Sequence, residues 1–278
     1  MMFIGEIGIN HNGSLDTALK LIDEAKRCGV DVVKFQKRDP SVCVPDHQKN
    51  VRRIWKGREM TYLEYKYDVE FWEEEYDIIN KHCKDIGIQW TVSVWDVPSV
   101  EFMKRYTNDI PFIKIPSACI TDVELLNAVN NWDIPAIMSD GMSTAEEVRN
   151  AFMELDNLIG ILHCNSSYPC EDNELDLNVI KTYKEIYDGL MIGYSGHEID
   201  TLPSLVAMAI GSDVIERHIT LDKNMEGSDH KCSLNIQELE ELMKQFKRIK
   251  TILGNNYVTV YDSEKQVRNK LRNKKYDD

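Results

Sequence analysis

Residues 3–35 read FIGEIGINHNGSLDTALKLIDEAKRCGVDVVKF, a stretch that predicts a strand, a helix and a second strand in succession. The short apolar and β-branched runs Phe3–Ile9 and Asp31–Phe35 are typical of strands. The stretch between them, Ser14–Cys28, has apolar residues at helical spacing, and Ser14 is suited to cap its N-terminus. Because parallel strands need a crossover connection, this unit predicts two parallel strands joined by a helix.

The same alternation continues along the chain. Six further runs are typical of strands: Gln89–Val94, Phe112–Pro116, Ala136–Ser139, Ile159–Cys164, Leu190–Tyr194 and Asp213–Thr220. Three further stretches have helical patterns: Thr121–Asn130, Ser143–Met153 and Asn235–Leu253. Ser143 and Glu146 predict a capping box at the start of the second. Eight parallel strands close a barrel that side chains fill, so we expect an α/β protein with a (β/α)8 TIM barrel. An open, doubly wound sheet is the alternative that this pattern allows.

The chain has 278 residues, which suits one such barrel of about 250 residues or two ordinary domains. No linker rich in Pro, Gly or Ser divides it, so we expect a barrel domain over residues 1–260 and a short basic tail over residues 261–278. We interpret the tail as a solvated terminal helix with a frayed end. Asp39–Asp68 is a long, charged and aromatic loop after the second strand, and loops of that length usually have a function.

The composition excludes several classes of protein. Lys plus Arg number 33 against 47 Asp plus Glu, a formal charge of −14, which argues against nucleic acid or an anionic membrane surface as the main partner. No apolar run approaches the roughly 18 residues that span a bilayer, and the first residues lack the pattern of a signal peptide. The seven Cys contain no CxxC motif and predict reduced thiols in a cytoplasmic protein.

Polar residues gather where the predicted strands end, which is where TIM barrels carry their chemistry. They are Glu6, Asn10, His11, Lys34, Gln36, Ser93, Asp96, Lys114, Ser117, Ser139, Asp140, His163, Asn165, Ser166, Tyr168, Ser195, His197, Glu216, Arg217 and His218. Charged groups are expensive to bury unless they are paired or bind a ligand. So many of them at one end of a barrel predict a polar, substrate-binding pocket.

Lys34 and Lys114 lie on strands that are not neighbours, so both could point at one anion. With Ser93, Ser117 and Ser195 they would bind phosphate and carboxylate groups, because Lys supplies charge and hydroxyls supply hydrogen-bond donors. Gln36, on the same strand as Lys34, is a further candidate for substrate binding. A structural ion pair is the alternative for each lysine taken alone.

His197 and His218 end two adjacent strands, and neutral imidazole is the commonest metal ligand in proteins. An open site completed mostly by oxygen would suit Mn²⁺ or Mg²⁺ better than a closed structural zinc site would. A hydrogen-bonded structural role is the alternative for each histidine.

Eight motifs in order resemble those of the sialic acid synthase family, which includes N-acetylneuraminate, legionaminate and pseudaminate synthases. They are EIGINHNGS (6–14), VVKFQ (32–36), KIPS (114–117), DGMST (140–144), LHCNSSYP (162–169), IGYSGH (192–197), VIERHIT (214–220) and GSDHKCSL (227–234). The resemblance covers roughly residues 3–255, with motifs in register across all eight predicted strands.

The resemblance implies a barrel enzyme that condenses phosphoenolpyruvate with an open-chain, N-acetylmannosamine-like aldose. The products would be a sialic or other nonulosonic acid, which is a 3-deoxy-2-ulosonic acid, and phosphate. It implies these residues for phosphoenolpyruvate: Lys34, Ser93, Lys114, Ser117, Ser166 and Ser195. It implies His197 and His218 as ligands of a divalent metal, Mn²⁺ first, with Mg²⁺ or Co²⁺ as alternatives. Glu6, Tyr168 and Asp229 match positions that, in members of the family, contact the sugar or its reacting oxygens. The catalytic residues would be Glu6, as the base for water, with Lys114 and His218.

Two features depart from the family pattern. Many members carry a Glu two residues after the Ser of the fourth strand, where it contacts the sugar, and this chain has Cys119. Full-length members continue into a small antifreeze-like domain, and we expect the barrel alone here. A homodimer is the default assembly of the family, although much of its contact comes from that domain.

Two alternatives remain open. The first is a phosphoenolpyruvate-dependent synthase that uses a smaller or phosphorylated aldose, which basic residues near the sugar such as Arg53, Arg58 or Lys66 would favour. The second is a non-catalytic sugar-binding barrel.

Overall fold

A closed barrel of eight parallel strands forms the centre of the computed structural model, which describes residues 1–272. In order around the barrel, the strands are β1 (Met2–Gly8), β2 (Val32–Lys37), β5 (Gln89–Val94), β6 (Ile113–Ile115), β7 (Ala136–Ser139), β8 (Leu158–Cys164), β9 (Met191–Gly196) and β10 (Val214–His218). Pairing of β10 with β1 closes the ring. The predicted TIM barrel is confirmed, and the open-sheet alternative is excluded. Each predicted strand is present, with its ends displaced by no more than two residues.

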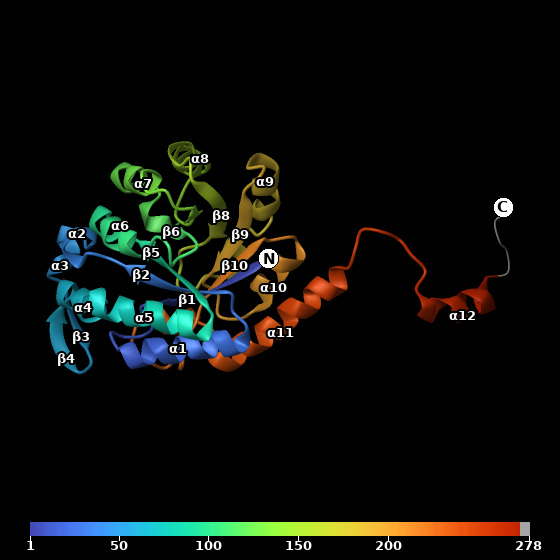
Figure 1. Cartoon of the computed structure of the whole chain (residues 1–278), viewed down its shortest axis with the longest axis horizontal. Helices are drawn as coiled ribbons and strands as arrows, with labels where there is room; N and C mark the ends of the chain where they lie inside the picture. The colour runs from blue at the N-terminus through green and yellow to red at the C-terminus, as the bar shows by residue number, and fades with distance from the viewer. Residues whose placement is uncertain (273–278) are drawn as a thin grey trace.

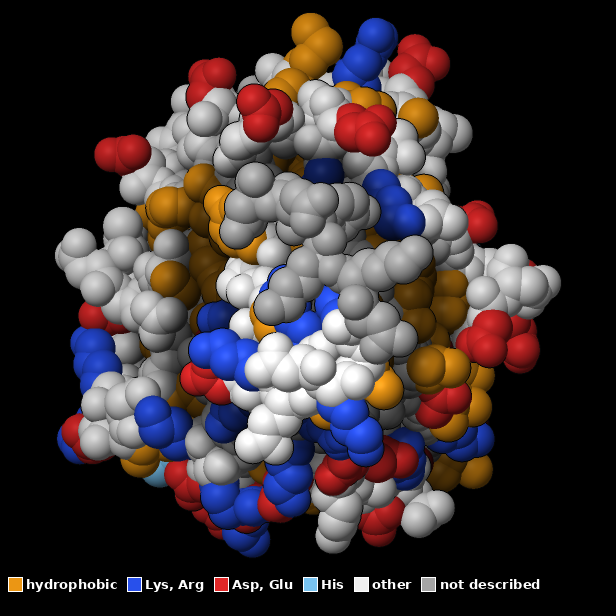
Figure 2. All heavy atoms as spheres, turned by 90° about the vertical axis from the view of Figure 1, so that its right-hand side faces the viewer, with side chains coloured by type: hydrophobic (Ala, Val, Ile, Leu, Met, Phe, Trp, Pro, Cys, Tyr) orange, Lys and Arg blue, Asp and Glu red, His pale blue; other side chains and the backbone are white. Residues whose placement is uncertain are grey.

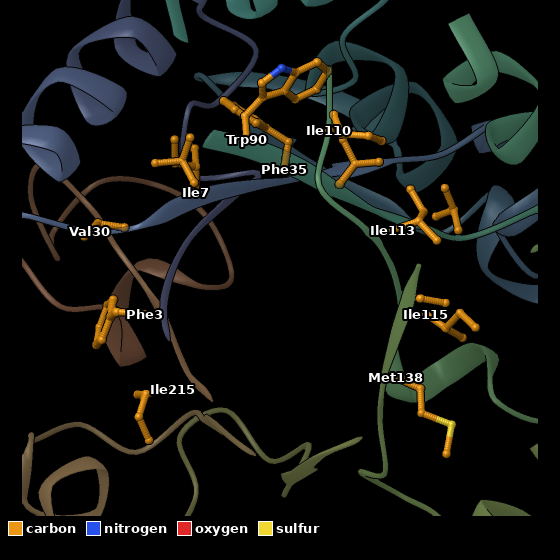
Figure 3. Packing of buried hydrophobic residues seen from close by; sticks show 14 of the residues in the cluster. Phe3, Ile7, Val30, Phe35, Trp90, Ile110, Ile113, Ile115, Met138 and Ile215 are labelled. Atoms are coloured by element: carbon orange, nitrogen blue, oxygen red, sulfur yellow. The ribbon is translucent and has the colours of Figure 1, made fainter. Parts of the chain in front are cut away.

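Helices surround the barrel (Figure 1). They are α1 (Leu15–Cys28), α5 (Glu73–Ile86), α6 (Val97–Met103), α7 (Val123–Asn130), α8 (Ala145–Glu154), α9 (Val179–Ile186), α10 (Leu202–Ala209) and α11 (Ile236–Leu253). Four short 3₁₀ turns accompany them: η1 (Lys104–Tyr106), η2 (Ser117–Cys119), η3 (Asp172–Glu174) and η4 (His230–Cys232). The larger hydrophobic core lies between the barrel and the surrounding helices. Figure 3 shows side chains such as Phe3, Ile115 and Met138 pointing from the strands toward the helices.

The ends of two helices test the predicted caps. Ser14 caps α1 as predicted, because its side chain accepts a hydrogen bond from Thr17 N. The capping box predicted at Ser143 is wrong, since the box is formed by Thr144 and Glu147. The Ser143 hydroxyl instead donates to Gly141 O, within the turn that precedes the helix.

The interior of the barrel changes from apolar to polar along the strands. Six buried apolar side chains pack together inside the barrel, nearer the N-terminal ends of the strands: Ile4, Val32, Phe112, Ile137, Leu162 and Val214. A second set of residues follows these, each two positions later in the same segment of the chain. They are Glu6, Lys34, Lys114, Ser139, Cys164 and Glu216. Because alternate residues of a strand share a face, this second layer lies directly above the apolar floor. A Cβ at Gly193 would lie 2.6 Å from the backbone carbonyl oxygen of Val214, so the close approach of β9 and β10 at this floor requires glycine there.

The segment predicted as a loop over Asp39–Asp68 has secondary structure of its own. It contains α2 (Pro40–Cys43), α3 (Asp46–Lys49), the antiparallel hairpin of β3 (Arg52–Trp55) and β4 (Arg58–Thr61), and α4 (Tyr62–Asp68). Trp55 and Tyr65 are buried in a small apolar cluster with Ile9, which follows β1. The segment is therefore packed onto the barrel at the end where the strands finish.

After α11 the chain leaves the barrel and forms α12 (Asp262–Leu271), which lies apart from it (Figure 1). Every described residue from Ile252 onward is exposed, which agrees with the predicted solvated helix, while residues 273–278 of the predicted tail lie outside the described part. Figure 2 shows the face from which this segment extends, where basic and acidic side chains are interspersed. None of the helices described is long and apolar enough to cross a membrane.

His11 is expected to make folding stability depend on pH. It is buried and stacked on Phe71 with ring centroids 3.9 Å apart, and burial lowers its pKa to about 3. The unfolded chain binds the proton near pH 6.5. The contribution of neutral His11 to the free energy of unfolding is therefore fully present above pH 6.5. It is lost as the pH falls toward 3, by up to about 1.4 kcal/mol per pH unit. Urea unfolding of the wild type and His11→Gln at pH 7 and pH 5 measures this loss. Equal pH dependence of the two proteins would show that His11 does not titrate in this way.

Candidate active site

A polar cavity of about 230 Å³ opens at the end of the barrel where the strands finish. Eleven of the predicted site residues line it: Glu6, Lys34, Gln36, Ser93, Lys114, Ser117, Ser166, Tyr168, Ser195, His197 and His218. Of the twelve residues expected to have a catalytic, substrate-binding or metal-binding role, only Asp229 lies outside this lining, and its carboxylate lies 3.9 Å from His218 Nδ1. Of the other polar residues expected at the strand ends, Ser139 and Glu216 line the cavity, and seven do not: Asn10, His11, Asp96, Asp140, His163, Asn165 and Arg217. The structure therefore brings together residues that span more than 200 positions of the chain.

Four buried side chains of alternating charge form a continuous set of ion pairs in this cavity. Lys34 Nζ lies 2.7 Å from Glu6 Oε2 and 3.8 Å from Glu216 Oε2. Lys114 Nζ lies 2.7 Å from Glu216 Oε1. None of the four is more than 4% exposed. The two lysines thus converge as the sequence suggested, and each also makes the ion pair that the sequence left open as an alternative.

Hydroxyl groups complete the surroundings of the lysines. Lys34 Nζ donates to Ser93 Oγ, and Ser195 Oγ donates to Glu216 Oε1 at 3.0 Å. Ser139 Oγ is buried in the same cavity and has no hydrogen-bond partner among the described residues. A buried, unpartnered hydroxyl is costly, so its presence in a cavity indicates a group that a ligand would satisfy.

The two carboxyl groups have pKa values displaced in opposite directions. Burial alone would raise the pKa of Glu216, but Lys114 and Lys34 outweigh it and lower the pKa to about 2. Burial raises the pKa of Glu6 above its usual range, against the opposing effect of Lys34. Such a division is typical of sites in which one carboxylate stays ionised while another exchanges a proton.

The two histidines present nitrogen atoms that suit a metal ion. His197 Nδ1 lies 2.6 Å from the Asn165 carbonyl oxygen, so Nδ1 carries the proton and Nε2 keeps a free lone pair. His218 Nδ1 is buried and has no hydrogen-bond partner within residues 1–272, and burial lowers the pKa of this ring to about 3, which keeps it neutral. The ring centroids are 5.5 Å apart. Within residues 1–272, no cluster of three or more His, Cys, Asp or Glu side chains is placed to hold a metal ion.

The rim of the cavity holds the remaining predicted residues. The Tyr168 ring packs on His197 with centroids 4.0 Å apart. Asp229 accepts a hydrogen bond from Ser228 Oγ, and although burial opposes it, His218 and Ser228 lower its pKa below the usual range. Asp229 is therefore an ionised group beside His218.

A second cavity of about 580 Å³ adjoins the first, and both are lined by Trp95 and Ala118. Arg38, Lys66 and Cys119 also line the larger one. Cys119 Sγ lies 3.7 Å from the Trp95 carbonyl oxygen, and burial raises the pKa of the thiol to about 12, so Cys119 is neutral.

Sequence reasoning missed the parts played by Glu216 and Gly141. Glu216 was placed at a strand end without a role, although its spacing of two residues from His218 predicts a shared face. Gly141 N donates to Ser117 Oγ at 3.0 Å, and a Cβ there would lie 2.3 Å from Ser166 Oγ. A side chain at this position would displace both serine hydroxyls, and the glycine of the motif DGMST contained this signal.

Known proteins resemble the chain over almost its whole length. A family model described as NeuB family matches residues 21–257. The chain is 37% identical to N-acetylneuraminate-9-phosphate synthase of Drosophila melanogaster, over 86% of its own length and 65% of that relative's. It is 33% identical to N,N'-diacetyllegionaminic acid synthase of Campylobacter jejuni, over 98% of its own length and 83% of that relative's.

Solved structures agree with these matches. The structure of N-acetylneuraminic acid (sialic acid) synthetase from Leptospira borgpetersenii superposes with a TM-score of 0.85 at 29% identity, covering 98% of this chain and 93% of that one. A truncated 3-deoxy-D-arabino-heptulosonate 7-phosphate synthase from Thermotoga maritima superposes with a TM-score of 0.66 at 15% identity, a likeness of fold alone.

Proposed function

The chain belongs to the NeuB family, and from that premise we propose that it condenses phosphoenolpyruvate with an open-chain aldose to give a nonulosonic acid and phosphate. The observation that carries the proposal is the cavity that holds Glu6, Lys34, Glu216, Lys114 and the two histidines His197 and His218 together. Relatives named as N-acetylneuraminate-9-phosphate and diacetyllegionaminic acid synthases support it.

In the proposed reaction, C3 of phosphoenolpyruvate forms a bond to the aldehyde carbon of the sugar. The aldehyde oxygen takes up a proton and becomes a hydroxyl group. Water adds to C2 of the former phosphoenolpyruvate, the bond between C2 and the phosphate oxygen breaks, and phosphate leaves. The product is a 2-keto acid with a methylene group at its third carbon.

Lys34 and Lys114 bind the phosphate and carboxylate groups of phosphoenolpyruvate in this proposal. Their ammonium groups are already held in place by Glu6 and Glu216, at 2.7 Å in each case. Cations that are oriented before the substrate arrives need no rearrangement during the reaction, which is the usual source of electrostatic stabilisation. The hydroxyls of Ser93, Ser117, Ser139, Ser166 and Ser195 supply further donors.

Glu6 takes the proton from the attacking water at its carboxylate oxygen. Burial raises its pKa, which makes it a stronger base than an ordinary carboxylate. Gln36 Nε2 donates to Glu6 Oε1 at 2.9 Å and so orients the carboxylate.

His197 and His218 would hold a divalent metal, Mn²⁺ first, with Mg²⁺ or Co²⁺ as alternatives, because Asn165 O engages only Nδ1 of His197 and because His218 Nδ1, among the described residues, has no hydrogen-bond partner. When bound, the metal supplies Lewis-acid polarisation of the aldehyde. Asp229 and Tyr168 orient the sugar from the rim.

The proposal extends to the whole chain. Residues 1–260 form the synthase domain, and 261–278 form a tail outside it. The protein acts as a cytoplasmic homodimer on small-molecule substrates, with no nucleic acid or membrane partner.

Release of inorganic phosphate from phosphoenolpyruvate with Mn²⁺, across a panel of aldoses, tests the proposal. The panel includes N-acetylmannosamine, diacetylated dideoxyhexoses and the phosphate esters of hexoses and pentoses. Release with one acceptor that stops when a chelator is added supports it. No release with any acceptor, from folded protein with Mn²⁺ bound, contradicts it.

A further inference from the structure

An ion pair is buried directly behind the two histidines of the cavity. Arg217 Nη1 lies 2.6 Å from Glu198 Oε1, and neither side chain is more than 2% exposed. Arg217 precedes His218 on β10, and Glu198 follows His197 just after β9. Because neighbouring residues of a strand face opposite sides, Arg217 faces the helices while His218 faces the cavity. The residue next to each histidine is thus bound to the residue next to the other.

Arg217 also contacts the backbone after β9 and the start of α10. Its Nη2 donates to the backbone carbonyl oxygen of Glu198 at 2.6 Å. Its Nη1 lies 2.8 Å from Asp200 O and 2.9 Å from Ser204 Oγ. Since both the side chain and the backbone of Glu198 are bound, the chain immediately after His197 is fixed relative to β10.

The carboxylate of Glu198 is held from a second side. Tyr194 OH donates to its Oε2 at 2.8 Å, and Ser204 Oγ donates to its Oε1 at 3.2 Å. Gly196, which pairs with Arg217 in the sheet, leaves room for this carboxylate, because a side chain there would displace it. Both carboxylate oxygens are therefore oriented by groups on β9 and α10.

A charged pair in this position is weak evidence for stability. Replacement of a buried ion pair by apolar side chains of similar volume is often neutral or stabilising, because taking two charges out of water is costly. Charge-assisted hydrogen bonds of a guanidinium group add direction and geometry that apolar packing does not. The contacts of Arg217 therefore point to control of geometry at the ends of β9 and β10.

The two histidines depend on such control. His197 Nδ1 is bonded to Asn165 O, whereas His218 Nδ1 has no hydrogen-bond partner in the part of the chain that the structure describes. The ring centroids are 5.5 Å apart. Metal–ligand distances in protein sites hold to about 0.2 Å, so a shift of either strand end would remove one nitrogen from a shared ion.

We propose that Glu198 and Arg217 are positioning residues that hold His197 and His218 at the spacing a divalent metal requires. Neither lines the cavity, so the pair acts through the histidines and not on a substrate. The inference rests on the metal site of the proposed condensation, and it adds to that site the residues that set its affinity.

Calorimetric titration with Mn²⁺ tests the inference. Glu198→Gln leaves Arg217 without its anion, and we expect the affinity for Mn²⁺ to fall by about 100-fold, the upper range for partners that orient metal ligands. Glu70→Gln is the matched control, because Glu70 is also a buried carboxylate paired with a buried cation, Lys37. It should unfold in less urea than the wild type, as Glu198→Gln does, and keep its affinity for Mn²⁺.

Tyr194→Phe and Tyr106→Phe form a second pair that disturbs folding less. Each removes one hydrogen bond from a buried phenol to a carboxylate: Tyr194 to Glu198 at 2.8 Å, and Tyr106 to Asp77 at 2.7 Å. Tyr194→Phe should lower the affinity for Mn²⁺ by about 10-fold, and Tyr106→Phe should leave it unchanged. In phosphate-release assays, the Mn²⁺ concentration for half-maximal activity of Tyr194→Phe should rise by the same factor, with kcat restored at saturating Mn²⁺.

Unchanged Mn²⁺ affinity in folded Tyr194→Phe would overturn the inference and leave the proposed condensation intact. An equal loss in Tyr106→Phe would also overturn it, because the affinity would then follow stability in general. If the wild type binds no Mn²⁺, the inference fails together with the metal site, and phosphate release then decides the condensation separately.

Discussion

Lys34→Met is expected to lower kcat/KM for phosphoenolpyruvate by about 10³-fold. Removing one preorganised donor from an active site commonly costs a factor of about 10² to 10³, and here the donor is also a full buried charge. Lys34 is 2% exposed and contacts both Glu6 and Ser93. Steady-state phosphate release with a saturating sugar measures the effect. The loss should fall mainly on KM for phosphoenolpyruvate if Lys34 binds the ground state as strongly as the transition state.

Lys37→Met provides the matched control on the same strand. Lys37 is also 2% exposed, and its Nζ lies 2.8 Å from Glu70 Oε1. It faces the helices rather than the cavity, since it lies over the rings of Trp72 and Phe102. Both variants break a buried ion pair, so the free energy of unfolding should fall by a similar amount in each, about 3–5 kcal/mol.

Activity should separate the two variants, because only Lys34 touches the substrate in the proposed reaction. Measurements at low temperature, with the folded fraction followed by circular dichroism, keep the comparison valid. Equal kcat/KM losses in Lys34→Met and Lys37→Met would show that Lys34 acts through stability alone.

His218→Ala is expected to abolish metal-dependent turnover while the protein stays folded. Lewis-acid stabilisation contributes several kcal/mol, so the loss should reach roughly 10³-fold. His218 makes no side-chain hydrogen bond at Nδ1, so its removal breaks no such contact there. Calorimetric titration with Mn²⁺ is the second readout, and the affinity should fall together with the activity.

His163→Ala is the control for this change, because His163 also lies near the end of a barrel strand. Its two ring nitrogens are already engaged, Nδ1 with Asp140 Oδ2 at 2.9 Å and Nε2 with Leu175 O at 2.8 Å. The variant should lose stability and keep its affinity for Mn²⁺. Unchanged Mn²⁺ affinity and activity in His218→Ala would remove His218 from the metal site.

The barrel could be predicted from the sequence because its signals are local. A short apolar strand that is buried on both faces and an amphipathic helix each have a pattern that can be recognised within a dozen residues. The approximate gathering of Lys34, Lys114 and His218 followed from the rule that strand ends meet at one end of a barrel.

Other features depend on contacts that no local pattern contains. The segment over residues 39–68 looked like a loop because its elements are at most seven residues long and are held by burial of Trp55 and Tyr65 rather than by periodicity. The contact of Arg38 with Gln36 and with the Trp95 ring depends on how distant segments fold together, and only the folded chain shows it. The cap at Thr144 rather than Ser143 depends on a turn that uses the Ser143 hydroxyl.

The apolar floor of the barrel has a consequence for the route that substrates take. Ile4, Val32 and Leu162 are fully buried beneath the smaller cavity, so nothing enters or leaves through that end. Phosphoenolpyruvate, the aldose and both products of the proposed reaction therefore share the open end of the barrel, where the exposed side chains of Met142 and Tyr168 border the smaller cavity.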